Sequence, residues 1–424
     1  MIGALVPAFF ALLLLGLPIF ASLALAVTGI LHFTTGIDPV VVPMRMFSGM
    51  NNFSLMSIPF FILAAELMRI GGLSDRLIGL ARALIGWLPG GLAAATVVAC
   101  LMFGSISGSS PATVIAIGTI MYPAMVKAGY DKYFAIGLIT TAGTLGPIVP
   151  PSIALIIYGS VTGTSVGRLF AAGLMPALLI GSMLIVYASW YSARKGYPRD
   201  AMPTFGSIAA AFRNAAWGLG LPVVLLGGIY SGVFTPTESA AAACLYGWFI
   251  GAVIYRSIGF RDTLLILRNT GLLAGPLLLI TAGASAFSWL LANTGAPAQL
   301  ASAILSGSDH PVVVIALFNL ILLVAGCFLD SASAIIILAP LMQPIAAQVG
   351  VDPIHFGIIM LVNLSVGMLT PPVGLNLFVA MGIAKMTLFE IFRAAIPTIM
   401  LMIVALMLIS YIPAISNFLP SLLF

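Results

Sequence analysis

Charged residues are scarce in this sequence. Asp, Glu, Lys and Arg make up 6% of its 424 residues, whereas an average soluble domain is about a quarter charged. A water-soluble fold of this size would have no polar surface, so the composition excludes an ordinary soluble protein. The mean hydropathy of +1.20 indicates a chain that lipid surrounds over most of its surface. A membrane span takes about 20 apolar residues, so the chain has room for roughly ten.

Cysteine and histidine are equally scarce and are scattered along the chain. Cys100, Cys244 and Cys327 form no CxxC pair, and the three histidines have no carboxylate at ligand spacing. This pattern predicts neither a disulfide framework nor a metal site other than one for sodium. There is also no P-loop and no HExxH motif. These absences argue against an ATP-driven pump and against a membrane-embedded enzyme, and no cofactor is expected.

One polar connector lies near the middle of the chain, at residues 192–213. Its basic residues are Arg194, Lys195, Arg199 and Arg213. The positive-inside rule places this connector in the cytoplasm. Two short amphipathic stretches, Leu73–Trp87 and Phe260–Asn269, are predicted to lie at the membrane interface. The first 33 residues are too long and too apolar for a simple signal peptide, so we expect them to be membrane structure.

The two halves of the sequence resemble each other after a shift of 221 residues (344 − 123). The matched positions are Pro123 and Pro344, Gly129 and Gly350, Asp131 and Asp352, and the double prolines 150–151 and 371–372. Such matches are unusual in a chain rich in Leu, Ala and Ile. They predict a first repeat at 1–193, a linker at 194–215 and a second repeat at 216–424.

The basic residues also predict the relative orientation of the two repeats. If Arg69, Arg76 and Arg82 lie in the cytoplasm with the linker, the first half begins outside and the second half begins inside. The sequence therefore predicts an all-α polytopic protein with two inverted repeats, an arrangement found in many secondary transporters.

A polar, Gly- and Ser-rich break interrupts an apolar region in each half. The breaks are Gly104–Thr113, GSISGSSPAT, and Gly326–Ser333, GCFLDSAS. Unsatisfied backbone groups in hydrocarbon cost several kcal/mol, so such a break must be buried in protein or line a wet cavity. The pattern is typical of a re-entrant helical hairpin or of a discontinuous helix. The simpler alternative is that small residues only let helices pack closely.

A double proline follows each of these breaks, in Thr144–Tyr158 and in Ser365–Phe378. Proline lacks an amide donor, so the carbonyl groups one turn earlier lose their partners and can coordinate a hard cation. The alternative is a plain kink. The residues predicted to bind sodium are Gly104, Ser105, Ser107, Gly146, Val149 and Pro151 in the first half, and Gly326, Cys327, Gly367, Thr370 and Val373 in the second.

Asp330 is the most conspicuous single residue, because an ionisable side chain within an apolar run is a functional candidate by default. It could instead cap the following helix through Ser333, and the two roles are compatible. Glu238 is expected to be an N-terminal helix cap or a scaffold contact, and Asp131 and Asp352 are expected to be structural loop residues. The residues predicted to bind substrate are Ser109, Ser110, Ser152, Asp330, Ser331 and Asn376; for Asn376, contact with a neighbouring helix is an equal alternative.

Several motifs, in order along nearly the whole chain, resemble the large membrane subunit of tripartite ATP-independent periplasmic (TRAP) transporters. They are GSISGSSPATVIAIG, GTLGPIVPPSIALIIYG, TPTESAA, FLDSASAIIILAPLMQP and LTPPVGLNLF. The resemblance implies an elevator-type secondary transporter, in which a transport domain with two re-entrant hairpins slides against a scaffold with arm helices. It implies sodium-driven uptake of an organic acid, of the C4-dicarboxylate or sialic acid type, across the bacterial inner membrane.

The resemblance also implies two partners. One is a small membrane subunit of about four helices, expected as a separate chain because this sequence starts with its first apolar run. The other is a periplasmic substrate-binding protein. A negative charge at Asp330 suits a sugar acid such as sialic acid slightly better than a dianion. The alternatives are an inverted-repeat sodium/carboxylate symporter that works without a binding protein, and a channel.

Overall fold

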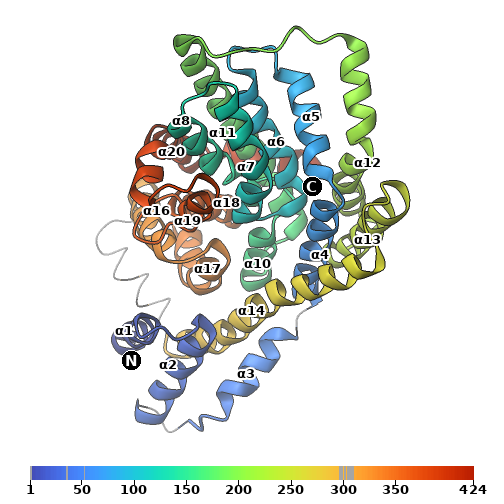
Figure 1. Ribbon diagram of the computed structural model, residues 1–424. Coiled ribbons are helices and arrows are strands. Elements are labelled where there is room, and N and C mark those ends of the chain that lie inside the picture. The colour runs from blue at the N-terminus through green and yellow to red at the C-terminus, as the bar shows by residue number, and fades with distance from the viewer. Residues whose placement is uncertain (1, 35–36, 52, 296–298, 300–301, 303–309) are drawn as a thin grey trace.

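The computed structural model describes residues 2–34, 37–51, 53–295, 299, 302 and 310–424, and its regular elements there are all helices. Figure 1 shows their arrangement. The helices of the first half are α1 (Ile2–Leu14), α2 (Ile19–Thr34), α3 (Val41–Met50), η1 (Phe53–Met56), α4 (Ser57–Ile70), α5 (Leu73–Ile85), α6 (Gly91–Ser107), α7 (Ser110–Lys127), α8 (Lys132–Ala142), α9 (Leu145–Ile148), α10 (Ile153–Thr162) and α11 (Val166–Lys195).

The second half repeats much of this order. Its helices are α12 (Phe205–Tyr230), α13 (Pro236–Phe249) with a π-helical turn η2 (Ile250–Ile254), α14 (Phe260–Asn293), α16 (Pro311–Phe328), α17 (Ser331–Gln348), α18 (Pro353–Gly367), α19 (Leu375–Ala384), α20 (Leu388–Tyr411) and α21 (Ala414–Leu423). A helix pair, a proline-broken helix and a long helix therefore follow one another twice, as α6 to α11 and as α16 to α20.

Seven described helices are long and apolar enough to cross a membrane, and nine if each bent pair counts as one span. This confirms a multi-pass membrane protein with fewer full spans than the roughly ten expected. The reason is that several apolar runs form short helices. Helix α6 has 17 residues and α19 has 10, whereas a span needs about 20.

The two amphipathic stretches have different structures. Leu73–Ile85 forms the separate helix α5, bent by 74° from α4 at Gly71 and Gly72, where Gly72 has a φ of +73°. The stretch Phe260–Asn269 is not a separate helix. It is the first part of the 34-residue helix α14, because neither a proline nor a left-handed residue separates it from the apolar run that follows.

Both Gly- and Ser-rich breaks are turns between two helices that pack against each other, so each forms a helical hairpin. The α6–α7 turn contains Gly108 in a left-handed conformation, with φ +58°, followed by the extended Ser109. The α16–α17 turn is made by Leu329 and Asp330, which are both extended. Both hairpins have internal contacts along their helices.

Both double prolines interrupt a helix, as the sequence predicted. The first separates α8 and α9 from α10, with a bend of 42°, and the second separates α18 from α19. The second helix of each hairpin also packs against the broken helix of the other half. Helix α7 contacts α19, and α17 contacts α10. The helices that flank the hairpin turns and the proline breaks of the two halves therefore pack against one another (Figure 1).

A second group of helices lies beside this central group. Helix α14 runs obliquely across the lower part of Figure 1 and packs against α2, α3 and α4, while α12 and α13 stand at the right with α4 and α5.

The connector between α11 and α12 crosses the opposite end of the molecule. Asp200 forms an ion pair with Arg82 at 3.0 Å, and the Tyr197 ring lies 4.4 Å from the Tyr130 ring.

The contact between α8 and α20 is a close one, and it generates a prediction about stability. A Cβ atom added at Gly137 would lie 2.2 Å from the carbonyl oxygen of Ala394. We expect Gly137→Ala to destabilise the protein by about 1–3 kcal/mol, because overpacking forces helices apart. A thermal-unfolding measurement in detergent checks this. Gly382→Ala is the control, since nothing lies within 4 Å of its added Cβ. Equal midpoints for the two variants would contradict the prediction.

Candidate functional site

A pair of glycines brings the hairpin and the broken helix of each half into backbone contact. A Cβ atom added at Gly104 would lie 2.9 Å from the Cα atom of Gly146, and one added at Gly326 would lie 2.9 Å from the Cα atom of Gly367. The structure thus brings together the two members of each pair, and the sequence had predicted all four residues to bind sodium. Only glycine permits so close an approach.

Oxygen atoms of the first hairpin surround the Gly104–Gly146 contact. The Ser107 and Thr113 hydroxyl oxygens lie 2.9 Å apart, and the Thr113 hydroxyl donates to the Ser109 carbonyl oxygen at 2.8 Å. A Cβ atom added at Gly146 would meet both the Ser109 oxygen and the Thr113 hydroxyl oxygen at 2.6 Å. Thr113 was not among the predicted site residues. Its signal was its position in the first turn of α7, one turn after Ser109.

The first proline break adds acceptors to the same place. An α-helix would bond the carbonyl oxygens of Gly146 and Pro147 to the amides of residues 150 and 151, which are both prolines without an N–H. Val149 is buried with Pro151, and the Val149 amide donates to the Leu145 carbonyl oxygen at 2.9 Å. Ser152 caps α10 by accepting from the Leu155 amide at 3.3 Å.

The second break differs, because its carbonyl groups already have partners. The Gly367 oxygen accepts from the Thr370 amide at 2.9 Å, and the Met368 oxygen accepts from the Asn376 amide at 3.2 Å. In the adjacent hairpin helix α16, the Cys327 oxygen accepts from the amides of Val373 and Gly374 at 3.2 and 3.3 Å. Val373 is 37% exposed, whereas the first break is buried throughout. The two halves therefore share a sequence pattern without sharing a hydrogen-bond pattern.

Three predicted ligands use their side chains in hydrogen bonds to backbone oxygens three or four residues earlier in the chain. The Ser105 hydroxyl donates to the Met102 oxygen at 2.7 Å, the Thr370 hydroxyl to the Val366 oxygen at 3.2 Å, and the Cys327 thiol to the Leu323 oxygen at 3.1 Å. Such bonds satisfy the side chain locally. These residues can still offer backbone oxygens to a cation.

Asp330 is the N-cap of α17. Its Oδ2 accepts from the amides of Ala332 and Ser333 at 3.0 and 3.2 Å, and its Oδ1 accepts from the Ser333 hydroxyl. The capping role anticipated through Ser333 is confirmed. An ionised carboxylate has about four acceptor positions, so three bonds leave capacity for another donor. Ser331, its neighbour, is buried and donates to the Met368 sulfur at 3.3 Å.

Asn376 joins the two halves at the centre of the molecule. Its amide nitrogen donates to the Ser110 hydroxyl oxygen at 2.6 Å, so two predicted substrate residues from opposite halves meet. Asn376 is fully buried, and its Oδ1 has no hydrogen-bond partner within the described part of the chain. A buried acceptor of this kind is costly unless it is paired, so a ligand donor fits this position.

The remaining acidic candidates are structural, as expected. Glu238 forms a capping box with Thr235 at the start of α13. Asp131 caps α8 by accepting from the amides of Tyr133 and Phe134, and Asp352 caps α18 in the same way. Such caps stabilise a helix by about 1 kcal/mol.

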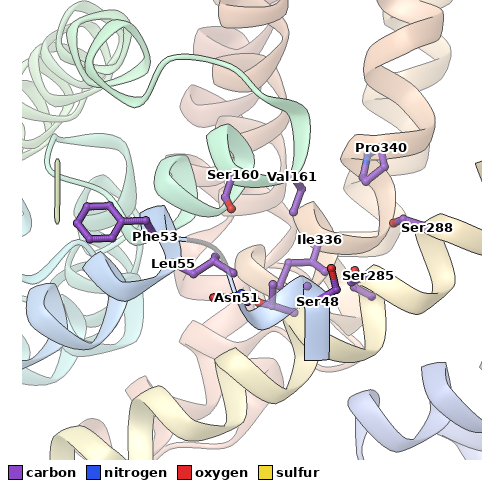
Figure 2. A pocket seen from close by; sticks show the side chains of 13 residues that line it. Ser48, Asn51, Phe53, Leu55, Ser160, Val161, Ser285, Ser288, Ile336 and Pro340 are labelled. Carbon is purple, nitrogen blue, oxygen red and sulfur yellow. The ribbon is translucent and has the colours of Figure 1, made fainter. Parts of the chain in front are cut away.

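A polar pocket of about 470 Å³ lies apart from the residues predicted to bind ligands. Figure 2 shows it between α3 and α14 on one side and α10 and α17 on the other. Its polar lining residues are Ser48, Asn51, Ser160, Thr281, Ser285 and Ser288. Sequence reasoning missed this pocket because distant elements build it. The available signal was a polar stripe at one face of α14, at 281, 285 and 288.

Comparison with known proteins identifies the family. Residues 6–415 match the family described as "Tripartite ATP-independent periplasmic transporter, DctM component". The chain is 42% identical to the C4-dicarboxylate TRAP transporter large permease protein DctM of Rhodobacter capsulatus, covering 97% of each chain. It is 40% identical to the isethionate TRAP transporter permease protein DctMQ of Oleidesulfovibrio alaskensis, covering 97% of this chain and 65% of that protein.

The fold is also similar to a solved structure, that of the Alcanivorax borkumensis YdaH transporter. The TM-score is 0.64 at 15% identity, and the match covers 95% of this chain and 98% of that one. The family match over most of the chain confirms the resemblance drawn from the motifs. The chain belongs to the DctM family, the large permease component of tripartite ATP-independent periplasmic transporters, and it is a transporter subunit and not an enzyme.

Proposed function

We propose that this chain carries out sodium-coupled import of an organic acid across the bacterial inner membrane by an elevator mechanism. In its family, the large permease works with a small membrane subunit and a periplasmic binding protein. The observation that carries the sodium proposal is the oxygen cluster at the Gly104–Gly146 contact. It combines neutral hydroxyl and carbonyl oxygens with a buried, proline-broken helix, the donor set that hard cations prefer.

The proposed first sodium site uses Ser107, Ser109 and Thr113 from the hairpin, with carbonyl groups of the 146–149 segment from the broken helix. The hydroxyl–hydroxyl bond between Ser107 and Thr113 can reorganise so that both oxygens face the ion, because hydroxyl groups rotate freely. In the second half the corresponding carbonyls are engaged by amides. We propose that sodium binding there follows a rearrangement of the exposed break around Val373.

The proposed substrate site lies at the Ser110–Asn376 contact, where the halves meet. The Ser110 hydroxyl can donate to a substrate carboxylate, and the unpaired Asn376 Oδ1 can accept from a substrate hydroxyl or amino group. The N-termini of α7 and α10 add partial positive charge. Both relatives described above are named for small organic acids, a C4-dicarboxylate and isethionate. The choice of sialic acid remains a prediction, since no described contact favours a sugar acid over these.

We further propose two inverted repeats in which α3 and α14 belong to the scaffold and α10 and α17 to the moving domain. The support is the shared element order of the halves and the polar pocket between these two pairs of helices. A hydroxyl-lined space at a sliding boundary would admit water and a hydrophilic solute. Neither a stand-alone symporter nor a channel accounts for the family membership as directly.

The sodium site predicts a specific effect of the Thr113 hydroxyl. We expect Thr113→Val to raise the sodium concentration for half-maximal uptake about tenfold, because it removes one neutral oxygen ligand, worth about 1 kcal/mol or more. Uptake into proteoliposomes at a series of sodium concentrations measures this, with both partners present. Thr119→Val is the control, since the exposed Thr119 hydroxyl donates to its own helix at Ile115. Undiminished uptake in potassium alone would refute sodium coupling.

Asp330→Asn separates capping from ligand binding. Asn and Asp rank together as N-caps, so we expect the variant to keep its thermal midpoint while uptake falls at least tenfold. Asp330→Ala should lose both uptake and stability, because the amides of Ala332 and Ser333 lose their acceptor. Uptake at the unmodified rate by Asp330→Asn would show that the carboxylate only caps α17.

The partner requirement can be tested by omission. A thermal-shift screen of the periplasmic binding protein first identifies the acid that it binds. We then expect uptake of that acid only when this chain, the small membrane subunit and the binding protein are all present. The stand-alone symporter predicts uptake of free acid by this chain alone, and a channel predicts a current without saturation.

A further inference from the structure

A shallow apolar groove lies between α11 and α20, away from every residue assigned to transport above. Its volume is about 370 Å³. It is lined by Ser182, Met183, Val186, Tyr187 and Trp190 of α11 and by Leu401 of α20. Val186 is 68% exposed and Trp190 is 51% exposed, so the groove opens outward from the protein. On a membrane protein, a surface of this composition faces lipid.

A cation stands at one end of this groove. Met183, Tyr187, Trp190 and Arg194 follow one another at intervals of four, three and four residues, which keeps them on one face of α11. The guanidinium carbon of Arg194 lies 4.5 Å from the centre of the Trp190 ring, in a cation–π contact. The groove therefore leads directly to a positioned positive charge.

This charge has no acidic partner among the described side chains. No carboxylate there lies within ion-pairing distance of Arg194, and Asp200 in the following connector is paired with Arg82 at 3.0 Å. Lys195, the last residue of α11, adds a second exposed cation at the same end. The end of the groove is therefore positively charged and can accept an anion.

The length of the groove along α11 matches the thickness of one leaflet of a bilayer. Ser182 and Arg194 are twelve residues apart on α11, which corresponds to about 18 Å along the helix axis. Half of the hydrocarbon core is about 15 Å thick. With Arg194 at the headgroup level, Ser182 lies near the middle of the bilayer. Trp190 and Tyr187 then lie toward the membrane–water interface, where aromatic residues are enriched.

We propose that this groove is a binding site for a phospholipid with an anionic headgroup. One acyl chain lies along Met183, Tyr187 and Trp190, and the phosphate accepts hydrogen bonds from the Arg194 guanidinium, whose planar fork fits phosphate oxygens. A zwitterionic headgroup places its own cation beside Arg194 and Lys195, whereas an anionic headgroup does not. Because Leu401 belongs to α20, the bound acyl chain contacts two helices of the central group at once.

Trp190 provides an internal probe for the test. The full-length chain is reconstituted in phosphatidylcholine vesicles that contain increasing fractions of brominated phosphatidylglycerol or brominated phosphatidylcholine, since bromine quenches tryptophan fluorescence on contact. The signal of Trp190 is the difference between the unmodified chain and Trp190→Phe. We expect half-maximal quenching of this signal at an about fivefold lower fraction of brominated phosphatidylglycerol, corresponding to about 1 kcal/mol per basic residue near a charged lipid.

Variants of the basic residues identify the headgroup contact. We expect Arg194→Gln, measured against Arg194→Gln with Trp190→Phe, to remove the preference, and Arg194→Lys to keep part of it. Arg199→Gln should keep all of it, because Arg199 lies outside α11 in the connector. Trp248 on α13, which is 44% exposed and has no basic residue within seven positions along the chain, should show no preference when the unmodified chain is compared with Trp248→Phe.

Three outcomes would overturn the proposal. Equal quenching of Trp190 by the two lipids would show ordinary contact with bulk lipid. A preference that survives Arg194→Gln would show that the headgroup is bound elsewhere. Absence of quenching by either lipid would show that protein, such as a second copy of this chain, covers the groove.

Discussion

The need to satisfy backbone polar groups in hydrocarbon governs the centre of this structure. Two double prolines remove amide donors from helices that an apolar environment surrounds, and unpaired carbonyl groups there cost several kcal/mol each. The hairpins come into backbone contact with these breaks, because Gly104 meets Gly146 and Gly326 meets Gly367. A larger residue at any of these four positions would separate the polar groups that depend on one another.

The two halves differ in how their backbone carbonyl groups are hydrogen-bonded, and this difference bears on the proposed coupling of transport to sodium. In the second half, backbone amides of the break itself donate to the Gly367 and Cys327 oxygens. In the first half, the Gly146 and Pro147 oxygens have lost their helical donors to Pro150 and Pro151, and the hydroxyl groups of Ser107 and Thr113 stand nearby. A cation in the first half would replace the hydrogen bonds among Ser107, Ser109 and Thr113, whereas in the second half it would also compete with amides that donate to the carbonyl groups of the break itself.

Contacts between the halves connect these sites to the substrate position. Helix α7 begins at the first hairpin turn and packs on α19, which follows the second proline break. The bond between Ser110 and Asn376 crosses this contact. A change at the first hairpin turn or at the second proline break therefore lies within about one helix turn of the proposed substrate site. This short connection is the physical basis on which ion binding and substrate binding could depend on each other.

The sequence alone determined the membrane class, the positions of the two Gly- and Ser-rich breaks, the two broken helices and the family, because apolar composition and Gly, Ser and Pro positions act locally on the chain. That each Gly- and Ser-rich break is a hairpin and not a discontinuous helix was decided by the packing of its two helices. The cap at Glu238 was also expected from the sequence, whereas Asp131 and Asp352, expected as structural loop residues, are N-caps of α8 and α18 in the structure. Only the tertiary structure decided which oxygen atoms at the hairpins and breaks already form hydrogen bonds within the protein and which remain free to bind a ligand. It revealed the approach of Thr113 to Gly146, the Ser110–Asn376 bond and the polar pocket. These features depend on packing between segments up to 266 positions apart, and local patterns carry no information about which such segments meet.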